Sequence, residues 1–85
     1  MNIQYTIEDI THTIQQAIIE NCEKQIDRVE LDKPLQEYIA NSIEFVKIIV
    51  DIEDKYEITF ANDELDIVNF KNVLEWAEFV EKKLS

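Results

Sequence analysis

Residues 41–56 read Asn41-Ser42-Ile43-Glu44-Phe45-Val46-Lys47-Ile48-Ile49-Val50-Asp51-Ile52-Glu53-Asp54-Lys55-Tyr56. Asn41 suits the N-cap of a helix, because its side chain can accept hydrogen bonds from the free N–H groups of the first turn. Glu44, three residues later, can reach back and complete a capping box. Polar residues at positions 44, 47, 51, 54 and 55 share one stripe at helical spacing. The stretch therefore predicts a helix with Ser42 in its first turn, at the positive end of the helix dipole.

The apolar residues of this helix cover a wider arc than one packing contact needs. Such a helix either lies centrally among several helices or keeps an apolar edge for a partner. We expect its main core residues to be Ile43, Val46, Ile49 and Ile52.

The residues before this stretch predict a first helix followed by a long loop. The helix is expected to begin at Thr6, with Asp9 at the capping-box position. Its apolar residues recur at helical spacing: Ile7, Ile10, Ile14, Ala17 and Ile18. The periodicity fades after Glu23, and residues 24–40 are long for a structureless connection in a small domain.

The residues after Tyr56 predict two more helices. Residues 57–60 are extended and partly apolar, but no second strand is present in the pattern to pair with them. A short helix is expected to start at residues 62–64 and to run through Leu65 and Val68. Asn72 then caps a last helix, whose apolar stripe is Val73, Trp76, Ala77, Val80 and Leu84. The expected fold is all-α, a small four-helix bundle with three longer helices and one short one.

Composition limits the kind of protein. The 85 residues are expected to form a single domain, 1–85, and 46% apolar residues are enough for a folded core. Glycine is absent, so turns that need positive φ must use Asn or Asp or be avoided. The net charge of −11 would repel phosphate backbones, which argues against nucleic-acid binding and favours basic protein partners.

The sequence also predicts where the protein resides. Cys22 is the only cysteine, so an internal disulfide framework is excluded and a reduced thiol in the cytoplasm is expected. Residues 1–5 lack the basic end and apolar run of a signal peptide, and no apolar stretch is long enough to span a membrane. We therefore expect a cytoplasmic monomer with no membrane partner.

No enzyme constellation is visible in the sequence. His12 is the only histidine and lies among polar positions on another predicted helix, so it is a poor base for Ser42. A glycine-rich phosphate loop is impossible without glycine, and the carboxylates do not follow the spacing of a calcium loop. The sequence predicts neither catalysis nor a metal site.

The triplet Asn41-Ser42-Ile43 and the helix after it resemble the acyl and peptidyl carrier proteins. That family has Asp-Ser-Leu or Asp-Ser-Ile, then an amphipathic helix that ends in an acidic run and an aromatic residue, here Glu53, Asp54 and Tyr56. The resemblance covers roughly residues 6 to 84 and includes a long loop between the first two helices, anchored by residues that match Leu35 and Ile39. Residues 39–42 depart from the family, because they are one residue shorter and lack its usual glycine.

The resemblance implies a role for each residue of the site. Ser42 would be esterified to 4'-phosphopantetheine, a covalent cofactor taken from coenzyme A, which holds cargo as a thioester. Partner enzymes would contact an outer surface and an acidic rim, which also includes Asp54. The partner-binding residues would be Asn41, Ile43, Glu44, Phe45, Lys47, Ile48 and Asp51. A cargo cleft between the second and third helices would be lined by Ile49, Ile52, Leu65 and Val68.

The implied function is that of a carrier protein for acyl or aminoacyl intermediates. Its partners would be a phosphopantetheinyl transferase, a loading enzyme and downstream biosynthetic enzymes. Lys47 stands where many fatty-acid carriers have an acid, and with Phe45 this favours a polyketide, nonribosomal-peptide or related pathway. The alternatives are a fatty-acid carrier, and an unmodified helical interaction module of the same fold.

Overall fold

The computed structural model describes residues 5–85, and over this range the only regular elements are helices and 3₁₀ turns. The long helices are α1 (Ile7–Asn21), α2 (Ser42–Tyr56) and α3 (Val73–Leu84), and the short 3₁₀ turns are η1 (Leu35–Glu37), η2 (Asn62–Glu64) and η3 (Ile67–Asn69). The expected all-α fold is confirmed. Residues 1–4, on which the expected absence of a signal peptide partly depends, lie outside the described residues.

The ends of the helices follow the predicted capping residues. Thr6 and Asp9 form the expected capping box at the start of α1. Asn41 caps α2 and Asn72 caps α3, and in both cases the Asn side chain accepts from the backbone N–H three residues later, at 2.9 Å. These polar caps satisfy N–H groups that a helix leaves free, so the three starts are fixed by local sequence.

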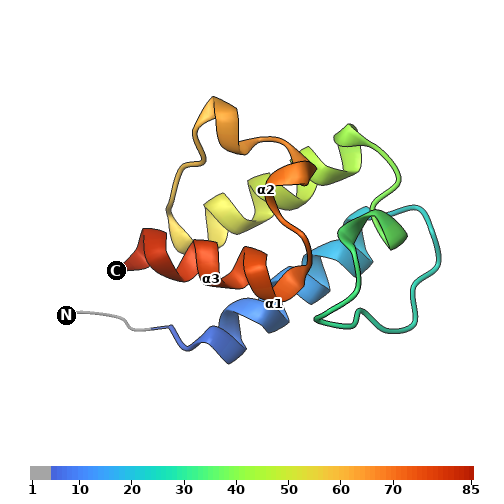
Figure 1. Cartoon of the computed structure of the whole chain (residues 1–85), viewed down its shortest axis with the longest axis horizontal. Coiled ribbons are helices and arrows are strands. Elements are labelled where there is room, and N and C mark those ends of the chain that lie inside the picture. Colours follow the sequence, from blue (N-terminus) through green and yellow to red (C-terminus); the bar gives the residue numbers. More distant parts are fainter. Residues whose placement is uncertain (1–4) are drawn as a thin grey trace.

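The core lies where α1 packs against both α2 and α3 (Figure 1). Ile10, Ile14 and Ile18 of α1 are fully buried, and so are Val73, Trp76 and Val80 of α3. The aromatic ring of Trp76 stacks against Phe45 of α2 and Phe70, with ring centroids 5.2 and 5.3 Å apart. Stacked aromatic rings bury much apolar area, so this cluster joins α2 to α3.

The long loop between α1 and α2 lies against the bundle on the right of Figure 1. Leu35 and Ile39, the two predicted anchors, are buried, as is Val29. Backbone hydrogen bonds join the loop to the start of α3, from Leu35 N–H to the Lys71 carbonyl at 3.2 Å and from Leu74 N–H to the Leu31 carbonyl at 3.3 Å. The loop is therefore held in place although it contains little regular structure.

Two features of residues 57–69 differ from the sequence-based expectation. The short helix expected through Leu65 and Val68 is instead the two turns η2 and η3, because the Asp66 side chain accepts from Val68 N–H and starts a separate turn. Among the described residues, the one with positive φ is Glu57, at φ 54°, and not an Asn or Asp. It ends α2 in the left-handed conformation that glycine usually supplies.

Candidate functional site

Ser42 is the first residue of α2 and is exposed. The N-cap role belongs to Asn41, whose Oδ1 accepts from Glu44 N–H, so the helix start does not depend on the Ser42 hydroxyl. The first backbone N–H groups of the helix and the positive end of its dipole are nearby, and both favour a negatively charged group. This placement suits a serine that is esterified to a phosphate.

A hollow of about 340 Å³ opens beside Ser42. It lies between the start of α2, the segment of residues 36–41 that precedes α2, and the segment of residues 65–67 that leads into η3. Its apolar walls come from Ile39, Phe45, Leu65 and Ile67. Two of the larger hollows, of about 480 and 580 Å³, have walls of mostly charged and amide side chains from α1, residues 27–32 and the second half of α2. Because neither includes Ser42, the smaller apolar hollow is the one that belongs to this site.

Glu44 does not lie on the outer surface, where the sequence predicted it. Its side chain is only 5% exposed and points to the loop. One carboxylate oxygen accepts from Ala40 N–H at 2.9 Å and the other from Glu23 N–H at 3.1 Å. These two bonds lower the pKa of Glu44 below its ordinary value, because they stabilise the charged form. The expected capping box at Asn41 is also corrected, since Glu44 reaches Ala40 instead.

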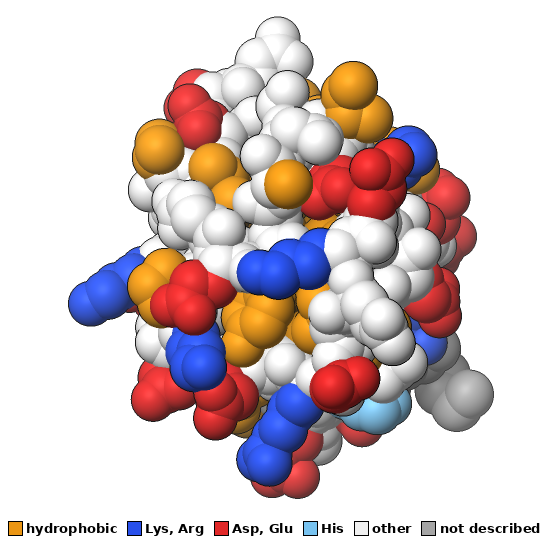
Figure 2. Space-filling view, turned by 90° about the vertical axis from the view of Figure 1, so that its right-hand side faces the viewer, with side chains coloured by type: hydrophobic (Ala, Val, Ile, Leu, Met, Phe, Trp, Pro, Cys, Tyr) orange, Lys and Arg blue, Asp and Glu red, His pale blue; other side chains and the backbone are white. Residues whose placement is uncertain are grey.

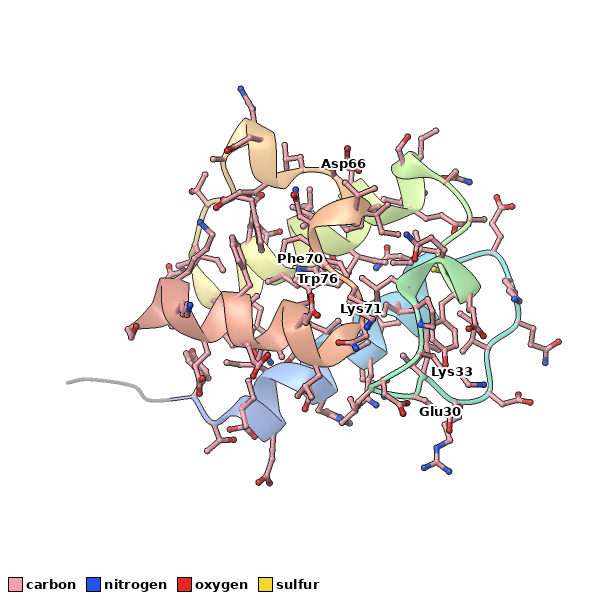
Figure 3. All side chains as sticks on the ribbon, viewed as in Figure 1. Glu30, Lys33, Asp66, Phe70, Lys71 and Trp76 are labelled. Carbon is pink, nitrogen blue, oxygen red and sulfur yellow. The ribbon has the colours of Figure 1, made fainter. Side chains whose placement is uncertain are left out.

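Phe45 and Ile48, expected to border the partner surface, are core residues instead. Phe45 is 2% exposed and Ile48 is fully buried. Phe45 contacts Trp76 and Phe70, which lie together between α2 and α3 (Figure 3). A partner docking on the outside of the folded protein cannot contact most of either side chain, although Phe45 also forms part of the hollow wall.

The outer side of α2 is instead formed by residues that the sequence assigned partly to the core. Ile43 is 67% exposed, and Val46 and Val50 are also exposed. The three follow the spacing i, i+3 and i+7, so they form one apolar stripe beginning next to Ser42. The burial pattern also leaves Asn41, Lys47 and Asp51 at the surface. The width of the apolar arc was the sequence signal for such a stripe, but it did not say which residues would form it.

The charges at this end of the molecule are mixed rather than uniformly acidic. Figure 2 views the end that the loop and the start of α2 form, and basic side chains lie there among acidic and apolar ones. With Glu44 turned inward, the expected acidic rim is reduced to Asp51 and Asp54, both exposed. Asp51 also accepts a hydrogen bond from Asn21 Nδ2 at 2.7 Å, which ties it to the end of α1.

The four residues expected to line a cargo cleft do not come together. Ile49 and Ile52 are buried in the core, whereas Val68 is 74% exposed. Leu65 alone among the four lines the hollow beside Ser42. Ile39 and Ile67, which line it as well, were not predicted for this role, because their positions depend on how residues 34–40 and 61–70 pack against α2.

The other chemically reactive side chains offer no catalytic arrangement. Burial, together with the negative charge of nearby Glu44, raises the pKa of the Cys22 thiol to about 11, so the thiol is a weak nucleophile. His12 is exposed on α1, as expected. Across residues 5–85, His, Cys, Asp and Glu do not gather into a group that could hold a metal ion. None of the helices described is long and apolar enough to cross a membrane.

Comparison with known proteins agrees with this geometry. The family model described as a phosphopantetheine attachment site matches residues 12–80. An acyl carrier protein of Exiguobacterium sibiricum is 32% identical over 80 residues, covering 93% of this chain and 99% of that protein. An acyl carrier protein of another Exiguobacterium species is 28% identical with the same coverage. No solved structure matches the chain.

An exposed serine hydroxyl at the start of α2, with a hollow beside it, fits the covalent group that this family carries. Members are carriers and not catalysts, and they work with a phosphopantetheinyl transferase and with biosynthetic enzymes. The family match, the two relatives and the helical fold all agree. The chain therefore belongs to the acyl carrier proteins, which bear covalently attached 4'-phosphopantetheine.

Proposed function

We propose that Ser42 carries the 4'-phosphopantetheine arm and that the protein presents acyl or aminoacyl thioesters on it to biosynthetic enzymes. The observation that carries this proposal is the exposed Ser42 hydroxyl at the start of α2, beside an apolar hollow. In the attachment step, Ser42 Oγ bonds to the phosphorus of coenzyme A that bears the pantetheine part. The bond from that phosphorus to the nucleotide part breaks, and the hydroxyl proton passes to a base on the transferase.

The outer side of α2 supports a proposal for the partner surface. The apolar stripe of Ile43, Val46 and Val50 begins beside Ser42 and is flanked by Lys47 and Asp51. An enzyme that must reach Ser42 and its arm would cover this stripe, and burying exposed apolar side chains favours association. Asn41, at the helix start, would lie at the edge of the same contact.

The pathway proposal depends on Lys47, because Phe45 lies in the core and no longer supports it. A cation beside the apolar stripe favours partners that differ from those of fatty-acid carriers, so we propose service in a polyketide, nonribosomal-peptide or related pathway. The apolar walls of the hollow beside Ser42 favour a second candidate, a fatty-acid carrier whose chain is sheltered there.

Replacing the serine tests the carrier function. The change Ser42→Ala should alter the free energy of unfolding by no more than about 0.5 kcal/mol, because the residue is exposed and Ala favours helices. Coenzyme A and a broad-specificity phosphopantetheinyl transferase should add one arm to the wild type, as measured by intact mass, and none to Ser42→Ala. Ser85→Ala, which changes the only other serine, should accept the arm like the wild type.

Two outcomes would contradict the proposal. A wild type that stays unmodified under conditions that load other carriers would favour an unmodified interaction module. An arm on a correctly folded Ser42→Ala variant would mean that another residue is the attachment site.

A further inference from the structure

The buried carboxylate of Glu44 holds both ends of the loop that precedes Ser42. Glu23 N–H, at the beginning of the loop, donates to one oxygen, and Ala40 N–H, two residues before Ser42, donates to the other. The loop between them spans residues 24–39, and Glu44 lies in the first turn of α2. One side chain therefore closes the loop onto the helix that carries the serine.

This arrangement has a specific cause in the sequence. Both donors are backbone N–H groups outside any helix, so they lack helical partners, and each makes a hydrogen bond to a charged acceptor, which is stronger than one to a neutral group. A carboxylate has two oxygens and can accept from both donors at once. Because Glu44 is 5% exposed, its charge is satisfied by these bonds more than by water.

We infer that Glu44 is a positioning residue for the modification of Ser42. This inference rests on the proposed attachment of the arm to Ser42. By fixing Ala40 and the beginning of the loop, Glu44 sets the wall of the hollow and the surface that the transferase meets together with Ser42, since Gln36, Ile39 and Ala40 line that hollow. Glu44 itself is buried against the loop and acts through Ala40 and Glu23, not through contact with the reacting atoms.

The change Glu44→Gln tests this role while keeping the size of the side chain. The amide has one acceptor oxygen, so only one of the two backbone donors can keep its bond, and the amide N–H₂ faces the other donor. The KM of the transferase for the carrier should rise about tenfold, the effect expected when the freed loop holds its binding-competent arrangement for only about a tenth of the time. The kcat at saturating carrier should stay within about twofold, since the serine and the reacting atoms are unchanged.

Two further measurements need no transferase, one on the loop itself and one on the charge beside Cys22. Amide hydrogen exchange at Glu23 and Ala40 should be faster in Glu44→Gln than in the wild type. The Cys22 thiol should react faster with iodoacetamide at pH 8, because its pKa, about 11 in the wild type, falls when the neighbouring negative charge is removed.

The chain offers a matched control at the start of α3. Glu75 occupies the same position after its N-cap Asn72, and its carboxylate accepts from Lys71 N–H at 3.2 Å. Glu75 is exposed and accepts only this one N–H from the segment before its helix. Glu75→Gln should therefore leave the KM, the exchange at Glu23 and Ala40 and the Cys22 reactivity unchanged.

Each other outcome rejects the inference. Unchanged exchange at Glu23 and Ala40 would mean that Glu44 does not hold the loop, and faster exchange with an unchanged KM would mean that holding the loop does not serve Ser42. An equal rise of KM in Glu75→Gln would indicate a general loss of structure. If Glu44→Gln does not fold, Glu44→Asp replaces it, because the shorter carboxylate keeps the charge but cannot reach both donors. A wild type that accepts no arm would instead contradict the proposed attachment at Ser42.

Discussion

Lys47 is exposed on α2, one helical turn after Ile43 of the apolar stripe. It lies among the side chains that an enzyme reaching Ser42 would cover. A basic enzyme surface would be repelled by it, so this one residue can discriminate between partners.

The change Lys47→Glu should make the protein a better substrate for fatty-acid enzymes, because it replaces repulsion of a basic surface by attraction. The kcat/KM for loading or elongation should rise roughly two- to fivefold, as expected for one exposed charge pair. Lys55→Glu makes the same charge change in the last turn of α2 and should have a smaller effect. An equal gain from both variants, or no gain from either, would leave the pathway preference without a basis.

At the scale of the element, α2 ends at Glu57, whose left-handed backbone conformation is unfavourable for a residue with a side chain. Glu57 has φ 54° and ψ 46°, and its N–H donates to the Glu53 carbonyl. The next residue, Ile58, also donates to the Glu53 carbonyl, at 3.3 Å. This arrangement closes the helix, but a side chain with Cβ pays a steric penalty in the left-handed region.

Glu57→Gly should therefore stabilise the protein, by about 0.5–1 kcal/mol, because the removed penalty exceeds the added freedom of the unfolded chain. Urea unfolding should show a higher midpoint with an unchanged m value. Glu78→Gly, at an exposed position inside α3, should instead cost about 1 kcal/mol. A destabilised Glu57→Gly variant would show that the Glu57 side chain makes a favourable interaction that outweighs its backbone conformation.

The elements could be predicted where local chemistry decides them. Thr6, Asn41 and Asn72 cap the helices from the sequence position alone, and the spacing of Val73, Trp76, Ala77 and Val80 identified the buried face of α3. Leu65 and Val68 were assigned to a helix because their pattern is too short to reveal that Asp66 starts a separate turn.

The site was predictable only in part, because the positions of its side chains depend on residues that are distant in the sequence. Glu44 has the spacing of a capping-box residue and of a surface acid, and neither pattern contains Glu23 or the fold of the loop that places its N–H nearby. Phe45 is buried through contacts with Phe70 and Trp76, residues more than twenty positions away in the sequence. Helical periodicity assigns relative faces, but it does not say which face of a widely apolar helix meets the rest of the protein.

At the scale of the whole molecule, Ser42 and the C-terminus lie on opposite sides. Ser42 is at the start of α2, on the right of Figure 1, and the C-terminus follows the end of α3, on the left. The radius of gyration is 12.0 Å, close to the screening length of about 10 Å at 0.1 M salt, so the charges nearest Ser42 act most strongly on an approaching enzyme. At lower salt more of the net charge of −11 contributes, even though basic side chains are mixed into the site.

Association with a basic transferase should accordingly depend on salt. Raising the ionic strength should lower the kcat/KM of the modification while kcat at saturating carrier stays constant, because screening slows the encounter and not the chemistry. Asp54→Asn should flatten this dependence more than Glu81→Gln, which removes the same charge from the far end of α3. A rate that does not change with salt would show that electrostatic steering, including any contribution from Asp51 and Asp54, does not operate.

Trp76 gives the protein a built-in optical signal. It is the only tryptophan, it is fully buried, and within residues 5–85 its indole N–H has no hydrogen-bond partner. An indole shielded from water emits at shorter wavelength than an exposed one. Its ring stacks on Phe45, which also forms part of the wall of the hollow beside Ser42. Cargo that entered the hollow and shifted Phe45 would alter the surroundings of the indole, so the fluorescence of the unlabelled protein would show whether its cargo is sheltered or exposed.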